Sequence, residues 1–169
     1  MVGLDAEARA PDEAEVIPDT VRFGNDGVDY GPLAHWAGFH LRMAQIASFH
    51  AFAKESQEVD LNPGRFALLT LIDRNPGISQ TALSKAYGRD KSTLTPALND
   101  LKRRGLIARV RLARDRRSYH LTLTPAGRAM LKRLTECAVR HERKLERIIG
   151  AREKARFLRI LAKIAFQVG

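Results

Sequence analysis

The spacing of apolar residues changes at Gly105, and this change limits the possible folds more than any other feature of the sequence. Upstream of Gly105, apolar residues recur at intervals of three and four, as in amphipathic helices. Over residues 106–123, apolar and polar residues alternate, as in half-buried strands. The alternating apolar positions are Ala108, Val110 and Leu112, then Tyr119, Leu121 and Leu123. The polar segment ARDRR between them predicts a hairpin whose tip carries Arg114, Asp115, Arg116 and Arg117.

Helices are predicted on both sides of this hairpin from apolar periodicity and capping residues. Thr124 followed by Pro125 is a typical helix start, as N-cap and first helical residue. The predicted helices run from Leu33 to about Ser56, from Pro63 to the Asn75-Pro76-Gly77 stop, from the Ser79 cap to Gly88, from Asp90–Ser92 to Gly105, from Thr124 to Ile149 before Gly150, and from about Arg152 to Phe166. Two short helices followed by a basic-tipped hairpin make a winged helix-turn-helix. The predicted fold class is therefore mainly α with a small β-hairpin wing.

The segment DKSTLTPALNDLKRRG, residues 90–105, combines an apolar stripe with an internal proline. The stripe consists of Leu94, Leu98 and Leu101, at i, i+4 and i+7. A helix that began at Pro96 would leave the first of these leucines outside, so we predict that the helix begins between Asp90 and Ser92 and continues through the proline. With Ser92 as N-cap, Pro96 would occupy the N4 position, where only the first intrahelical hydrogen bond is lost.

The net charge of +10 is concentrated in the second half of the chain. Residues 1–32 carry two basic and eight acidic side chains, and residues 33–84 are balanced. Residues 85–118 hold eleven basic and three acidic side chains, and residues 119–169 hold twelve and four. A basic excess concentrated around a helix-turn-helix predicts a surface that binds a polyanion.

Four segments are predicted from these patterns. The first helix and the last two helices are too apolar on one side for a single small lobe to cover, which predicts that two copies of the chain bury them together. The segments are an acidic, mobile N-terminal arm (1–32), a first dimerisation helix (33–60), the winged helix-turn-helix lobe (61–123) and the C-terminal dimerisation helices (124–169).

Composition excludes several other classes of protein. The apolar runs are far shorter than the roughly 20 residues that a membrane-spanning helix needs, and the N-terminus lacks the apolar core of a signal peptide. One cysteine, Cys137, cannot form an internal disulfide, which fits a reducing compartment. We therefore expect a cytoplasmic protein that has no contact with membranes.

Two motifs lie between Leu68 and Gly127, the block QTALSKAYGRDKSTLTPALNDLKRRGLIAR and the wing and helix start DRRSYHLTLTPAG. Through these motifs the chain from Leu68 to Gly127 resembles the multiple antibiotic resistance regulator (MarR) family. The order of helices and wing extends this resemblance to nearly the whole chain from Leu33. The resemblance implies a homodimeric DNA-binding transcriptional regulator that is usually tuned by a small ligand.

The helix face opposite the leucines and the wing supply the candidate DNA-binding residues. Hydroxyl and amide groups can read base edges, and asparagine prefers adenine, whereas Lys91 and Arg103 suit phosphates. Proline at position 96 departs from the basic residue that is commoner in the family. By resemblance, Arg117 or Arg116 enters the minor groove, and Asp115 either orients that arginine or only forms the turn. The candidates are Lys91, Ser92, Thr93, Thr95, Asn99, Arg103, Asp115, Arg116 and Arg117.

A candidate ligand pocket is also implied by the resemblance, between the dimerisation helices and the DNA-binding lobe. The residues that could line it are Trp36, Phe39, His40, Met43 and Phe66, with Arg42 or Arg65 to hold an anion. These aromatics could equally form plain core. An aromatic carboxylate or aromatic acyl-CoA is the expected ligand class, from family habit and from aromatics near cations.

Catalytic and metal sites are not predicted. RDKST lacks the glycines of a phosphate-binding loop, and HERKL lacks the second histidine of a zinc-protease helix. The histidines at 35, 40 and 50 lack metal-ligand spacing, and Cys137 is interpreted as a small core residue rather than a redox sensor. We expect no enzyme activity, no cofactor and no metal.

Two functions remain open from the sequence. The first is a homodimeric repressor that binds a palindromic DNA operator and is released by a small aromatic ligand. The second is a ligand-independent architectural or constitutive DNA-binding protein. They differ in whether a ligand cavity exists.

Overall fold

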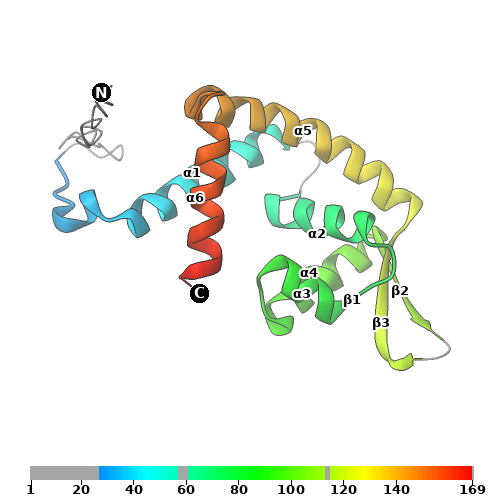
Figure 1. Ribbon diagram of the computed structural model, residues 1–169. Helices are drawn as coiled ribbons and strands as arrows, with labels where there is room; N and C mark the ends of the chain where they lie inside the picture. Colours follow the sequence, from blue (N-terminus) through cyan, green and yellow to red (C-terminus); the bar gives the residue numbers. More distant parts are fainter. Residues whose placement is uncertain (1–26, 57–60, 113–114, 169) are drawn as a thin grey trace, which may run out of the picture. The chain divides into compact units, whose positions relative to one another are not determined.

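The computed structural model describes residues 27–56, 61–112 and 115–168, and the side chains of residues 111–118 lie outside that description (Figure 1). Two compact units, Met1–Ile46 and Ala47–Gly169, divide within the first long helix. The elements are η1 (Gly31–His35, a 3₁₀ helix), α1 (Ala37–Glu55), α2 (Pro63–Arg74), β1 (Ile78–Ser79), α3 (Gln80–Tyr87), α4 (Lys91–Arg103), β2 (Ile107–Leu112), β3 (Asp115–Leu123), α5 (Pro125–Ile149) and α6 (Lys154–Gln167). The predicted fold class is confirmed. Most of the predicted acidic arm falls outside the described residues.

The helix predicted from Leu33 begins later than expected. Trp36 has extended backbone angles (φ −92°, ψ 120°) and separates η1 from α1. Pro32 is the second residue of η1, and the carbonyl of Ala34 lies 2.7 Å from His40 Nε2. The His40 side chain thus occupies the Ala34 carbonyl. In a continuous α-helix this carbonyl would instead accept a hydrogen bond from the backbone amide four residues later.

Side-chain caps begin α2, α3, α4 and α5, whereas α6 begins after Glu153 without one. Ser79 Oγ accepts a hydrogen bond from the Ala82 amide at 3.1 Å, and Thr124 Oγ1 accepts one from the Gly127 amide at 2.9 Å, which confirms both predicted caps. The N-cap of α4 is Asp90, whose Oδ1 accepts from the Thr93 amide at 2.8 Å. The prediction of Ser92 as that N-cap was therefore wrong.

Helix α4 continues through Pro96, as predicted, but the proline is its sixth residue and not its fourth. Pro96 has no amide hydrogen to donate to the Ser92 carbonyl one turn back. The helix ends where predicted, because Gly105 adopts φ +69° and donates to the Lys102 carbonyl at 2.9 Å. The Leu106 amide then bonds to the Leu101 carbonyl, which completes a Schellman cap.

The wing is a three-stranded antiparallel sheet in the order β1-β3-β2, not the predicted two-stranded hairpin. Strand β1 pairs Ile78 with Leu121 and Ser79 with His120. A two-residue strand is too short to show a period, so the sequence pattern could not reveal it. Leu112 pairs with Asp115, so Asp115, Arg116 and Arg117 belong to strand β3 and not to the turn. Pairing of backbone groups continues regardless of side-chain polarity.

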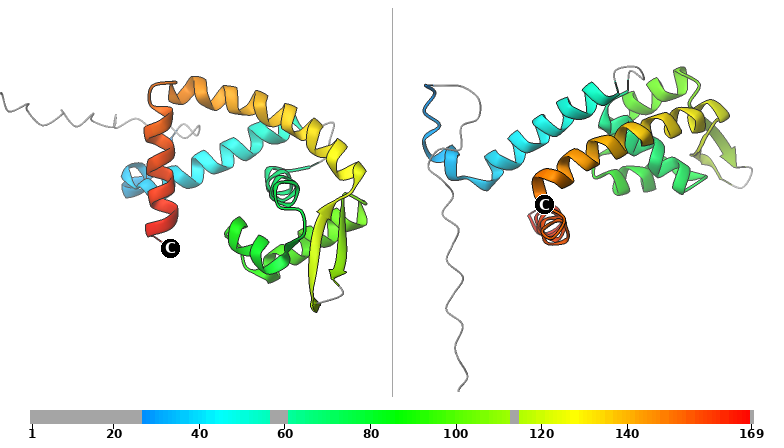
Figure 2. Two further views of the ribbon diagram at one scale, coloured as in Figure 1. Left: turned by 45° about the vertical axis from the view of Figure 1, so that its right-hand side comes forward. Right: turned by 90° about the horizontal axis from the view of Figure 1, so that it is seen from above.

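The core of the second unit forms between α2, α3, α4, α5 and the sheet. In Figures 1 and 2, α2 lies between α5 and the α3–α4 pair. The most completely buried side chains are Leu68, Leu69, Ile72, Leu83, Leu94, Leu98, Leu101, Leu121 and Leu134. Cys137 also belongs to this core, in agreement with its interpretation as a small core residue.

The apolar stripe of α5 is only partly covered within the described chain. Leu134 is buried, but Ile148, predicted on the same stripe, is 82% exposed. Helix α6 leaves several large apolar side chains exposed, namely Phe157, Leu158, Ile160 and Phe166, with Val168 following. Across the described ranges, no helix is both long and apolar enough to cross a membrane.

Candidate nucleic-acid interface

Helix α4 presents one apolar and one polar face. Leu94, Leu98 and Leu101 are at most 1% exposed. Lys91, Ser92, Thr93, Pro96, Asn99 and Arg103 are exposed, and Thr95 is half-buried. The predicted separation of the candidate DNA-binding side chains from the leucine stripe is therefore confirmed.

The Asp90 carboxylate organises the first turn of α4. The Ser92 and Thr93 hydroxyls both donate to it, in addition to the Thr93 amide. The bond from the Ser92 hydroxyl, followed by the two from Thr93, lowers the pKa of Asp90 to about 2. Because both hydroxyl protons are committed to Asp90, Ser92 and Thr93 have acceptor oxygens rather than donors left for a further partner.

Thr95 and Asn99, farther along the same face, are each held by a side chain outside α4. The Gln80 amide nitrogen of α3 donates to Thr95 Oγ1 at 2.9 Å, and Thr95 Oγ1 donates to the Lys91 carbonyl at 2.7 Å. Arg109 Nη2 of β2 donates to Asn99 Oδ1 at 2.9 Å. A guanidinium has only donors, so this contact turns the Asn99 oxygen toward Arg109 and leaves the amide nitrogen facing away from that bond.

Asp100 gathers three arginines at the side of α4. Its carboxylate accepts from Arg65 Nε of α2 at 2.8 Å, and its other oxygen accepts from Arg103. Arg104 Nε lies 3.4 Å from the same Asp100 oxygen that accepts from Arg65. Burial opposes ionisation of Asp100, but the Arg65 hydrogen bond and the arginine charges outweigh it, so the pKa lies below its ordinary value. The Arg103 side chain is still 79% exposed, so this ion pair leaves it accessible to a phosphate.

Among the described side chains of residues 85–118, the basic excess is largely uncompensated on the surface. Asp90 and Asp100 are engaged as described, and the third acidic residue, Asp115, lies among the side chains outside the description. Lys85, Arg89, Lys91 and Lys102 are exposed. Exposed cations next to ordered hydroxyl and amide groups suit a polyanion that also carries base edges.

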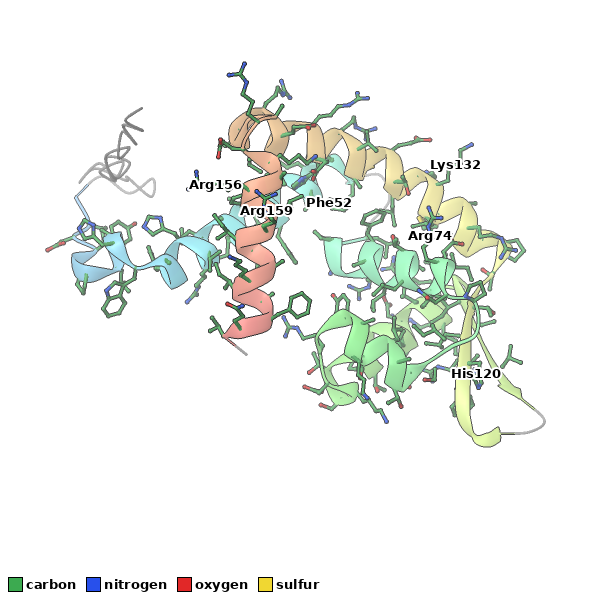
Figure 3. The ribbon with its side chains drawn as sticks, viewed as in Figure 1. Phe52, Arg74, His120, Lys132, Arg156 and Arg159 are labelled. Atoms are coloured by element: carbon green, nitrogen blue, oxygen red, sulfur yellow. The ribbon has the colours of Figure 1, made fainter. Side chains whose placement is uncertain are left out.

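Strand β3 attaches the wing to the chain segment that precedes β1 and α3. His120 of β3, labelled in Figure 3, has Nδ1 2.6 Å from the Gly77 carbonyl, just before β1. The side chains of Asp115, Arg116 and Arg117 lie outside the described residues, so their roles at the wing stay predictions.

The candidate ligand residues fall in both units. In the first unit, Phe39 packs on Tyr30 with ring centroids 5.7 Å apart, and His40 faces the Ala34 carbonyl. Trp36 is 58% exposed, Arg42 is exposed and Met43 is half-buried.

The two candidate ligand residues of the second unit, Arg65 and Phe66, are adjacent on the first turns of α2. Phe66 contacts Phe52 with centroids 5.8 Å apart, and Phe52 contacts His141 of α5 at 5.7 Å. His141 Nε2 lies 3.0 Å from the Ser48 carbonyl of α1. The Arg65 side chain, predicted to hold an anion, is bound to Asp100.

Sequence reasoning missed Asp90, Gln80, Asp100 and Arg109 at this interface. Asp90 stands just before a helix, where aspartate is a typical N-cap, and could have been found. Gln80 and Arg109 carry no local signal, because their partners lie on other elements.

Comparison with known proteins agrees with this architecture. The MarR family model matches residues 61–119. A putative transcriptional regulatory protein for the hcr operon of Thauera aromatica is 34% identical over 136 residues, which cover 80% of this chain and 82% of that protein. The transcriptional repressor CouR bound to a 23-mer DNA duplex has a TM-score of 0.76 at 37% identity, over 82% of this chain and 98% of CouR.

Two ligand complexes are also similar in fold. CouR bound to p-coumaroyl-CoA has a TM-score of 0.77 at 33% identity, over 83% of this chain and 99% of CouR. PcaV from Streptomyces coelicolor, in complex with its natural ligand, has a TM-score of 0.75 at 25% identity, over 84% of this chain and 100% of PcaV. Together with the helix-turn-helix and wing described above, these similarities show that the chain belongs to the MarR family of DNA-binding transcriptional regulators.

Proposed function

We propose that this regulator binds a palindromic DNA operator as a homodimer, represses transcription, and is released by a small aromatic carboxylate or its CoA thioester. The observation that carries the proposal is the polar face of α4, which is exposed over a buried leucine stripe and lies in the basic segment of the chain. A helix with this construction fits the major groove.

The proposed division of labour on DNA follows the chemistry of each side chain. Lys91 and Arg103 contact phosphates, which set the position of the protein without reading sequence. Ser92, Thr93, Thr95 and Asn99 face base edges. Arg117 or Arg116 of the wing enters the minor groove, with Asp115 beside it, a role that rests on resemblance to the family.

The homodimer is supported by apolar surface that the described residues of one chain leave exposed. Phe157, Leu158 and Ile160 of α6 are 40%, 53% and 46% exposed. A second copy of the chain would remove this surface from water. Two copies would also present two recognition helices to a two-fold symmetric operator, at half-sites about 34 Å apart.

The aromatic acyl-CoA class is supported by one similar protein, and the binding of a ligand by a protein of this fold is supported by a second. CouR has been solved with p-coumaroyl-CoA and PcaV with its natural ligand. In this chain the proposed ligand contacts are the aromatic and sulfur side chains Trp36, Phe39, His40, Met43 and Phe66, with Arg42 and Arg65 as cations. Such a ligand releases DNA only if it binds the DNA-free conformation more tightly.

Two substitutions on α4 should separate phosphate contact from base reading. With an operator selected from random DNA, Lys91→Ala should weaken binding to all sequences and lower the slope of log K against log salt by about 0.9 for each of the two Lys91 phosphate contacts of the homodimer. Asn99→Ala should cost about 1–3 kcal/mol on the operator and little on random DNA. Fluorescence anisotropy over a salt series measures both, and sedimentation should give two chains per operator. If both variants lose specific and non-specific binding equally, the division between phosphate contact by Lys91 and base reading by Asn99 is incorrect. A single chain bound per operator would contradict the homodimer.

Ligand release should depend on the aromatic residues and not on α4. We expect p-coumaroyl-CoA, at 100 times its Kd, to raise the free energy of unfolding by about 2.7 kcal/mol and to displace the operator. Trp36→Ala should keep operator binding but blunt this release, whereas Ser92→Ala should weaken operator binding and keep the ligand response. Thermal shift and anisotropy with p-coumaroyl-CoA, p-coumarate and acetyl-CoA measure these effects. Failure of every aromatic acid and CoA ester to displace the operator would favour the ligand-independent DNA-binding protein instead.

A further inference from the structure

We propose that Gln80, the first residue of α3, reads one base pair of each half-site, and that Thr95 of α4 orients it. The residues on α4 would then form only part of the reading surface. The proposal starts from the 2.9 Å contact between the Gln80 side-chain amide and Thr95 Oγ1. It depends on the DNA binding of this family and not on repression or on a ligand.

The direction of this hydrogen bond follows from counting protons. A threonine hydroxyl has one proton to donate. Thr95 Oγ1 lies 2.7 Å from the Lys91 carbonyl, which can only accept, so the single proton is directed there. The hydroxyl oxygen must therefore accept from Gln80, and the amide nitrogen of Gln80, not its oxygen, faces Thr95. This assignment removes the usual ambiguity between the two ends of the amide.

The rest of the Gln80 amide is available to DNA. One N–H and the carbonyl oxygen remain, and neither forms a hydrogen bond within the described residues. A side-chain amide that offers one donor and one acceptor matches N7 and N6 of adenine in the major groove. Gln80 is therefore expected to favour an A·T pair.

The position of Gln80 is also held before DNA arrives. Ser79, the preceding residue, is both the N-cap of α3 and the partner of His120 in the sheet. The Gln80 side chain is half-buried and bonded to α4, so little rotamer freedom remains to be lost on binding. A side chain ordered in advance contributes more of its contact energy to discrimination between bases.

The alternative role for Gln80 is a brace that only holds α3 against α4. A brace would stabilise binding to every sequence alike, because it acts through the position of α4. A reading residue would change the preference at one base pair per half-site and leave the others unchanged. The pattern of base preferences therefore separates the two roles, whereas affinity for one operator does not.

The test measures base preferences with the full-length protein. An operator is selected from random DNA with the wild-type chain, and every single base-pair variant of it is then measured by competition anisotropy. The same set is measured with Gln80→Ala, Gln80→Glu, Thr95→Val, the Gln80→Ala/Thr95→Val double variant, and Thr81→Ala as the matched control. Thr81 is the next residue of α3, is exposed, and takes no part in the contact between Gln80 and Thr95.

Gln80→Ala should reduce the preference for adenine at one position of each half-site by about 5- to 150-fold and leave the other positions unchanged. Substituting 7-deazaadenine at that position should weaken the wild-type protein but not Gln80→Ala. Gln80→Glu should shift the preference there toward cytosine, whose amino group a carboxylate accepts. Thr95→Val should weaken the same preference, and its effect should not add to that of Gln80→Ala. Thr81→Ala should leave all base preferences as they are.

A uniform loss of affinity with unchanged preferences in Gln80→Ala would overturn the proposal and establish the brace. Unchanged binding by Gln80→Ala would overturn it as well. A Gln80-dependent preference for a base other than adenine would overturn the orientation assigned to the amide. Thermal unfolding of each variant identifies any that fails to fold, and in that event the shift toward cytosine in Gln80→Glu decides the question.

Discussion

Replacing Gly127 with alanine is expected to lower the free energy of unfolding by more than about 3 kcal/mol, or to prevent folding of the DNA-binding lobe. A Cβ atom at position 127 would lie 1.9 Å from the Leu106 carbonyl oxygen and 2.9 Å from its carbon. These are backbone atoms, so no side-chain rotation can relieve the clash. The same Leu106 oxygen accepts from the Thr124 amide at 3.1 Å, so moving it away also disturbs the start of α5.

Gly38→Ala is the matched control for this effect. Gly38 lies within α1, and an added Cβ there would meet no atom of the described residues within 4 Å. Removing a helical glycine where space is open should raise stability by about 0.5–1 kcal/mol. Urea unfolding followed by circular dichroism measures both changes. If Gly127→Ala unfolds at the wild-type urea concentration, the close packing of α5 on Leu106 is incorrect.

Replacing Leu98 with alanine is expected to cost about 2–5 kcal/mol of unfolding free energy. Leu98 is 0% exposed and lies on the α4 face opposite the candidate DNA-binding side chains. The substitution would leave a cavity between α4 and the rest of the core, because the surrounding leucines cannot fully close over it. Operator binding should fall in proportion to the unfolded fraction and return when temperature is lowered toward the stability maximum.

Lys102→Ala is the control for the Leu98 substitution, because Lys102 lies on the same helix and is exposed. Its effect on unfolding free energy should remain within about 0.5 kcal/mol. The same urea titration measures both variants. A Leu98→Ala protein as stable as Lys102→Ala would show that α4 does not pack through this stripe.

Local patterns predicted most of the fold because the forces behind them act between residues close in sequence. The leucine stripe of α4, the caps at Ser79 and Thr124 and the helix ends at Gly88, Gly105 and Gly150 all depend on one or two turns of chain. The lack of a catalytic motif likewise agrees with a family of transcription regulators. Prediction failed locally at Ser92, where Asp90 provided a carboxylate that accepts both the amide and the hydroxyls.

The sequence by itself therefore determined the order of the helices, the wing and the polar face of α4. Tertiary structure alone decided how Thr95, Asn99 and Asp100 of α4 are held. Gln80 reaches Thr95 from α3, Arg109 reaches Asn99 from β2, and Arg65 reaches Asp100 from α2. Tertiary structure likewise decided the pairing of strand β1 and the close approach of Gly127 to Leu106. A hydrogen bond between different elements depends on the direction and distance of two side chains after packing, and no periodicity along one element records either quantity.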